Sequence, residues 1–163
     1  MRNALVVIFL ANSAVAHADL DADRKRKDAD DSLAEQLKRT NDHCGTKLTA
    51  SFDYASEKNK PADPPGAGAN ICFAVVKGIS DVCDKDDGKQ GVKSKLKVVK
   101  CAYDGKVTSK KSGKHAVATD LSGNPHAVPH AYIQLDKTTL KYSFDWFTAN
   151  SEQETAEFLT KQL

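Results

Sequence analysis

Four cysteines, all of them C-terminal to a typical secretory signal, constrain the fold of this chain more than any other feature. The signal has a basic residue at Arg2, an apolar run over 5–11 and a small-residue cleavage site at 16–18. We therefore predict that residues 1–18 are a cleaved signal peptide and that the protein is secreted or periplasmic. No later segment is apolar enough to cross a membrane. Disulfides are expected in such a compartment, between Cys44, Cys72, Cys83 and Cys101.

The helical spacing of two cysteines selects the disulfide pairing. Apolar residues recur with a helical period from Cys72 to Cys83, which predicts a helix over 71–83. Eleven residues of helix span about 16 Å, whereas a disulfide needs Cα atoms within about 7 Å. If the strands before and after this helix both run antiparallel to it, Cys44 lies near Cys83 and Cys101 near Cys72. We predict the pairs Cys44–Cys83 and Cys72–Cys101.

The N-terminal region divides into a charged segment and a helix. Residues 19–31 are almost entirely charged, with both signs mixed, so we expect a flexible tether that cannot bury apolar surface. Ser32 and Glu35 match a capping box, which predicts a helix from Ser32 to Cys44. A single domain is therefore expected over 32–163.

Alternating apolar residues predict the strands of this domain. The clearest pair is a hairpin whose strands lie around 131–135 and 140–146. Ser151 and Glu154 form a second capping box, before a C-terminal helix. Further strands are expected over 46–54, 92–103, 105–108 and 115–119, with a bulge or a short helical turn near the start of 92–103. The predicted fold class is α+β: an antiparallel sheet of about four to six strands packed on the central disulfide-bonded helix, with additional N- and C-terminal helices.

No catalytic, cofactor or metal site is predicted. The cysteine gaps of 28, 11 and 18 positions do not match the paired spacing of structural zinc sites. His126 and His130 are four positions apart, but Pro125 and Pro129 exclude the helix that would bring them together. A small secreted hydrolase that uses these two histidines or His115 is the weakest functional hypothesis.

A lysine-rich stretch is the strongest surface feature. Residues 89–114 contain nine lysines and one acidic residue, Asp104, although the whole chain is nearly neutral. One interpretation is a surface for a polyanion. The other, favoured by the absence of arginine, is an edge strand that lysines protect against aggregation. The residues that would contact a polyanion are Lys93, Lys95, Lys97, Lys110, Lys111 and Lys114.

The leading functional hypothesis is a secreted or periplasmic binding or interaction module without catalytic activity. It rests on the signal, on the predicted disulfides and on the lack of a recognisable catalytic constellation. A polyanion-binding protein that uses the lysines of 89–114 is the alternative. The partner is accordingly a protein or an anionic polymer, and the sequence does not choose between them.

Overall fold

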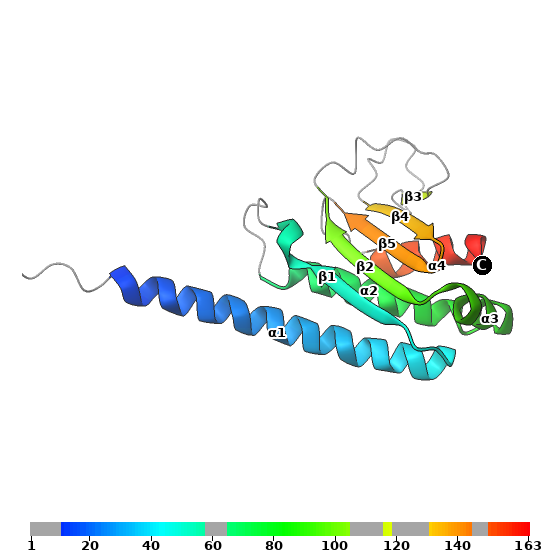
Figure 1. Ribbon diagram of the computed structural model, residues 1–163, viewed down its shortest axis with the longest axis horizontal. Coiled ribbons are helices and arrows are strands. Elements are labelled where there is room, and N and C mark those ends of the chain that lie inside the picture. The colour runs from blue at the N-terminus through cyan, green and yellow to red at the C-terminus, as the bar shows by residue number, and fades with distance from the viewer. Residues whose placement is uncertain (1–10, 58–64, 105–115, 119–130, 145–149) are drawn as a thin grey trace, which may run out of the picture.

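The computed structural model describes residues 11–57, 65–104, 116–118, 131–144 and 150–163. Helices form a layer on one face of a mixed sheet (Figure 1). The helices are α1 (Ala11–Cys44), α2 (Ala67–Val82), α3 (Asp86–Lys95) and α4 (Ser151–Gln162), with a 3-10 helix at Tyr54–Glu57. The strands are β1 (Thr49–Asp53), β2 (Val98–Tyr103), β3 (Ala116–Ala118), β4 (Ala131–Asp136) and β5 (Thr139–Phe144).

The sheet follows the order β1-β2-β5-β4-β3 and is not antiparallel throughout. Strands β1 and β5 both run parallel to β2, whereas β4 is antiparallel to β5 and β3 to β4. The α+β class is as predicted, but the prediction of an antiparallel sheet is wrong for β1, β2 and β5. The chain leaves β1, passes through α2 and α3, and enters β2 in the same direction, as a crossover connection does.

The hairpin predicted from alternation is present as β4 and β5. It pairs from Ala131 opposite Phe144 to Asp136 opposite Thr139, and Lys137 in its turn has a positive φ of 55°. Alternate side chains of the sheet point towards the helices and form one wall of the core. The buried ones are Phe52, Val99, Cys101, Ala131, Ile133, Leu140, Tyr142 and Phe144.

Helix α2 lies at the centre of the helical layer. It packs against α1 and α4 and also against β1 and β2. Val75, Val76 and Ile79 are fully buried on it, as expected for a helix that is covered on more than one side. Gly78 allows the α4 backbone at Glu152 to approach closely, since a Cβ at Gly78 would overlap the Glu152 carbonyl oxygen.

Two disulfides connect α2 to its neighbours, in the pairing that the helical spacing favours. Cys44 at the end of α1 bonds Cys83 just after α2, with their Cα atoms 5.4 Å apart. Cys72 near the start of α2 bonds Cys101 in β2, with a Cα separation of 5.7 Å. All four cysteines are buried, so both bonds lie inside the core.

Residues 19–31, predicted above to form a flexible tether, are helical and belong to α1. That prediction is wrong because opposite charges four positions apart face each other on a helix. Lys25 pairs with Asp21 at 2.6 Å and Lys27 with Asp31 at 2.7 Å. Ser32 does not cap a helix but lies inside α1, where its hydroxyl donates to the Asp28 carbonyl at 2.8 Å.

Two further elements differ from their predictions. The strand expected over 92–103 begins only at Val98, because α3 extends to Lys95. Helix α4 begins at Ser151 as predicted, but its N-cap residue is Asn150, whose side chain makes no capping hydrogen bond. The Glu154 carboxylate instead accepts a hydrogen bond from the buried Tyr142 hydroxyl at 2.7 Å. The Glu154 side chain, which the sequence pattern assigned to a capping box, therefore links α4 to the sheet.

Candidate functional site

The N-terminal ends of three strands meet at one end of the sheet. The Thr49 backbone N–H donates to the Lys97 carbonyl at 3.0 Å, and the Lys97 N–H donates to the Thr138 carbonyl at 2.9 Å. These bonds place the start of β1, the start of β2 and the β4–β5 turn side by side. Helix α3 reaches the same place, because it ends two residues before Lys97.

Five lysines belong to these converging segments. Lys93 and Lys95 lie on the last turn of α3, and Lys97 lies between α3 and β2. Lys47 lies two residues before β1, and Lys137 is in the β4–β5 turn. All five side chains are exposed. We call this group, Lys47, Lys93, Lys95, Lys97 and Lys137, the basic end.

The basic end differs from the predicted lysine surface. Lys93 and Lys95 are helical rather than alternating on a strand. Strand β2 lies between β1 and β5, so the interpretation of these lysines as protection of an edge strand is wrong. Lys47 and Lys137 were missed because they are distant in sequence, although each stands just before a strand. Lys110, Lys111 and Lys114 lie outside the described residues, as do His115, His126 and His130.

Four of the five lysines of the basic end form no ion pair with a described residue, although Lys137 adjoins the Asp136 carboxylate. The Lys95 ammonium donates to the backbone carbonyls of Gln162 and Leu163, at 3.2 and 3.0 Å. Among the residues that the structure describes, no ion pair engages Lys47, Lys93, Lys97 or Lys137.

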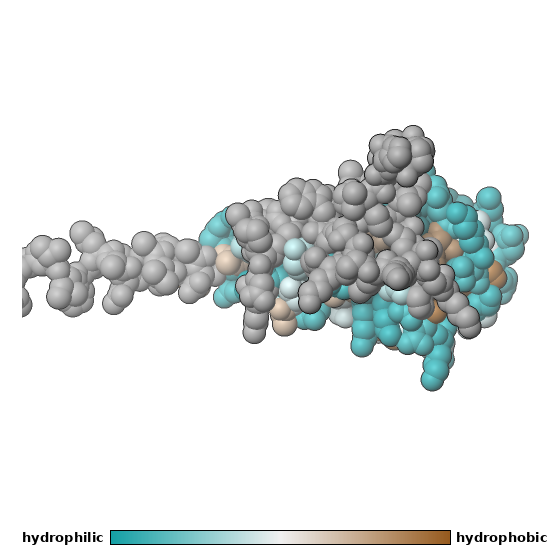
Figure 2. Space-filling model, turned by 90° about the horizontal axis from the view of Figure 1, so that it is seen from above, coloured by the Kyte–Doolittle hydropathy of each residue, from teal (hydrophilic) through white to brown (hydrophobic). Residues whose placement is uncertain are grey.

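Several cations elsewhere on the molecule have acidic partners. On α1, Lys27 pairs with Asp31 and Arg39 pairs with Glu35. On β5, Lys141 pairs with Asp136 at 2.8 Å. Figure 2 shows hydrophilic side chains at the end of the molecule where α3 lies. At the basic end, five lysines come from segments that meet at one end of the sheet, and neighbouring like charges there reinforce one another.

Comparisons with protein-family models, curated proteins and solved structures returned no match to this chain. The assignment of a function therefore depends on the chain's own chemistry. Among the described residues, no helix combines the length and apolar character needed to cross a membrane.

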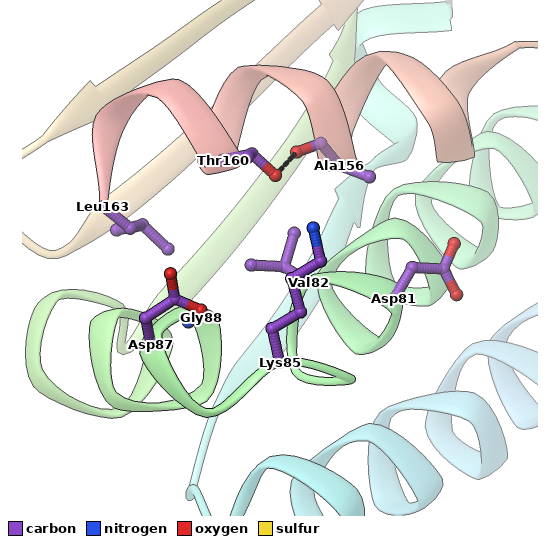
Figure 3. Close-up of a pocket in the computed structure, with 8 residues that line it drawn as sticks. All are labelled: Asp81, Val82, Lys85, Asp87, Gly88, Ala156, Thr160 and Leu163. Carbon is purple, nitrogen blue, oxygen red and sulfur yellow. Dashed lines mark hydrogen bonds between the residues drawn. The ribbon is translucent and has the colours of Figure 1, made fainter.

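A pocket of about 250 Å³ lies between the end of α2, the start of α3 and the end of α4 (Figure 3). Two of its polar side chains already have local partners. The Thr160 hydroxyl donates to the Ala156 carbonyl at 2.7 Å, and the Asp87 carboxylate accepts from the Gly88 N–H at 2.8 Å. Its remaining lining residues are Asp81, Val82, Lys85 and Leu163. With one lysine and two aspartates, the pocket has no marked preference for a ligand charge.

The carboxyl group of Asp81, at one side of this pocket, has a raised pKa. Burial is the largest cause, and the neighbouring Glu152 carboxylate raises the pKa further, whereas Lys77 lowers it. Lys77 is itself bound to Glu152, with Nζ and Oε1 2.6 Å apart. The three groups connect α2 to α4, so their arrangement is that of a helix–helix contact.

Side chains that could bind a metal or act in acid–base catalysis do not form an enclosed site in the described part of the chain. Within the described part of the chain, no three His, Cys, Asp or Glu side chains gather where they could hold a metal ion. His43 lies 3.1 Å from the Asp84 carboxylate, but both side chains are exposed at the surface. Enclosure is what normally gives such a pair a perturbed acid–base role. The basic end is therefore the candidate site.

Proposed function

We propose that this protein is an extracytoplasmic binding module that holds an anionic polymer at its basic end. The observation that carries the proposal is the group of four exposed lysines, Lys47, Lys93, Lys97 and Lys137, none of which forms an ion pair with a described residue. Ammonium groups that are held on a fixed scaffold without local partners attract an anionic chain and release its condensed counterions.

The type of partner follows from the type of cation. Lysine is a compact point charge on a flexible stem, whereas planar arginine suits bidentate recognition of one phosphate or carboxylate. The basic end contains lysine and no arginine. It is therefore suited to a polymer whose repeated charges matter more than the identity of any one unit. Affinity for such a polymer falls steeply as salt concentration rises.

The compartment is proposed from two independent features. Both disulfides are buried, and stable structural disulfides are typical of oxidising compartments. The sequence of residues 1–18 has the features of a secretory signal. Together they support a secreted or periplasmic location.

The test compares two triple variants with the same loss of charge. In the first, Lys93, Lys97 and Lys137 become glutamine. In the control, Lys27, Arg39 and Lys141, all of which have acidic partners, become glutamine. Affinity for heparin and for double-stranded DNA is measured by fluorescence titration at several salt concentrations.

We expect the first variant to bind at least tenfold more weakly than the control. Its log–log salt slope for DNA should fall by about 2 to 3, since each phosphate contact contributes about 0.9. A preference for heparin or for DNA would identify the class of polymer. Equal losses in the two variants would show that only net charge matters, and would refute the proposal.

A further inference from the structure

The outer edge of β1 has backbone groups that nothing in the described protein uses. The Thr49 N–H bonds Lys97, so residues 49, 51 and 53 direct their N–H and C=O groups towards β2. Because successive residues of a strand alternate, residues 48, 50 and 52 direct theirs away from β2. Strand β1 is first in the sheet order, so these groups face its outer edge.

One side chain satisfies the first of these residues. The Asn41 amide oxygen accepts from the Leu48 N–H at 2.7 Å, and the Asn41 amide nitrogen donates to the Leu48 carbonyl at 3.0 Å. Ala50 and Phe52 receive no such partner: within the described chain, no hydrogen bond to their outward N–H and C=O groups is present. At this edge, the outward backbone groups of Leu48 are therefore hydrogen-bonded, whereas those of Ala50 and Phe52 have no partner among the described residues.

The open part lacks the usual protection of an edge strand. Proteins commonly place lysine, proline or a bulge on such an edge to prevent pairing with another chain. The exposed side chains here are those of Thr49, Ser51 and Asp53. Thr49 and Ser51 are small and uncharged, and β1 pairs with β2 in regular register over all five residues.

Helix α1 runs along this edge and supplies a second surface. Asn41 contacts Leu48 at the start of β1, and the Tyr54 hydroxyl donates to Asp30 at 2.8 Å just beyond its end. Positions 30 and 41 are eleven residues apart, which is about three helical turns, so they share one face of α1. Ala34 and Leu37 lie on the same face between them. Ala34 is exposed and Leu37 is partly buried.

We propose that the β1 edge is a docking site for an extended peptide segment of another protein, which adds to the sheet as a further strand. Its backbone would pair with Ala50 and Phe52, which offer two donors and two acceptors. Its side chains on one face would lie over Ala34 and Leu37, so small or apolar residues at alternate positions would fit best. Such strand addition takes affinity from the main chain and specificity from alternate side chains.

The layer of helices favours a peptide over a second copy of this protein. Helix α2 packs under β1 and β2, and α1 packs beside α2 on the β1 side (Figure 1). With strands about 4.8 Å apart and packed helices about 8–10 Å apart, an added strand lies over α1. A second copy paired through β1 would bring its own α1 into the same layer, where it would collide with α1 and α2. An isolated strand brings no helix.

The small size of the β1 edge also favours a peptide over a second copy of this protein. A strand of five residues is about 17 Å long, and a pair of such strands buries on the order of a few hundred Å². A stable dimer usually buries about 1,200 Å² or more. Strand pairing alone is therefore too small for a stable dimer, but it is enough to hold a peptide that also covers the α1 face.

The test uses two variants that block different parts of the site. Ala50→Pro removes an N–H that the ladder to β2 does not use, and proline is tolerated on such an edge. Ala34→Arg places a long charged side chain on the α1 face under the added strand. Ser32→Arg is the matched control, since Ser32 is exposed on a different face of α1 and gains the same charge. Thermal unfolding establishes that each variant is folded.

The probe is a displayed library of random decapeptides, selected on the full chain and followed by titration of the strongest binder. We expect Ala50→Pro and Ala34→Arg each to weaken binding at least tenfold, and Ser32→Arg to change it less than twofold. Amide exchange at Ala50 and Phe52 should be fast in the free protein and slow in the complex. No enriched peptide, or a peptide that binds Ala50→Pro normally, would overturn the proposal. A dimer in sedimentation that Ala50→Pro abolishes would overturn it in favour of a second copy.

Discussion

Replacing Gly78 by alanine tests the close packing of α2 against α4. Alanine normally stabilises a helix interior by about 1 kcal/mol relative to glycine, so an exposed site would gain stability. At Gly78 the new Cβ would overlap the Glu152 carbonyl oxygen and lie 3.0 Å from its carbonyl carbon and 3.1 Å from Thr155 Cβ. Ordinary contacts begin at about 3.4 Å. Because the obstacle is largely backbone, α4 must move.

The magnitude follows from two opposing terms. Overpacking of a core costs about 1–3 kcal/mol, and a backbone obstacle belongs at the upper end of that range. Subtracting the helix-propensity gain of about 1 kcal/mol leaves a net destabilisation of about 2 kcal/mol. For a chain of this size, that lowers the melting temperature by roughly 4–8 °C. Urea unfolding with both disulfides intact gives the free energy directly.

Gly91→Ala is the control. A Cβ there would meet the side chain of Leu163, 2.7 Å from its Cβ, and that residue lies just after the end of α4. Leu163 lies outside α4 and can shift without moving that helix, so the helix-propensity gain should offset most of the cost, and stability should change by less than about 1 kcal/mol. If Gly78→Ala is as stable as the parent protein, the contact between α2 and α4 is looser than described, and the reasoning fails.

Two further predictions concern the disulfides and Asp81. Replacing both Cys44 and Cys83 by alanine opens a loop with a sequence separation of 39 residues. Chain entropy gives an upper estimate of about 4 kcal/mol for the resulting loss in the free energy of unfolding. A loss below about 1 kcal/mol in urea unfolding would contradict this prediction. The raised pKa of Asp81 means that the folded state binds its proton more tightly, so stability falls as pH rises above the ordinary value of 3.8. The Asp81→Asn variant should therefore unfold at a higher temperature than the parent protein at pH 7, and the two melting temperatures should converge below pH 3.8. If the difference in melting temperature persists at low pH, the ionisation of Asp81 is not its cause.

The predicted disulfide pairing implied the direction of two strands of the sheet. It assumed that the strands before and after the central helix both run antiparallel to that helix. Two strands with the same direction relative to one helix are parallel to each other, as β1 and β2 are. The expectation of an antiparallel sheet contradicted this assumption, since an antiparallel arrangement would reverse β2 relative to β1.

Charge composition was the weakest guide to local structure. The mixed charges of residues 19–31 indicate disorder by composition, but their order along the chain creates pairs such as Lys27 with Asp31 on a helix. The helix is also continuous with a segment whose Ala29 and Leu33 are buried in the core. Spacing, rather than composition, separates a helix of this kind from a flexible segment.

The candidate sites depended on contacts between distant segments. The run of lysines pointed to Lys93, Lys95 and Lys97, but Lys47 and Lys137 join them only because three strands start side by side. The β1 edge had no sequence signal at all. It follows from the sheet order, which places β1 outermost, and from Asn41, whose side chain bonds only the outward groups of Leu48.

The positions of the disulfides divide the protein into a covalent part and a non-covalent part. Both bonds fall between Cys44 and Cys101, and no cysteine follows Cys101. The covalent part contains β1, α2, α3 and β2, and α2 is fixed near both ends. Strands β4 and β5 and helix α4 are held by non-covalent contacts alone. Partial opening should therefore begin in the C-terminal third, releasing Tyr142 and Glu154 to water first. The β1 edge would survive such an opening, so a bound peptide and a loosened C-terminal third could coexist.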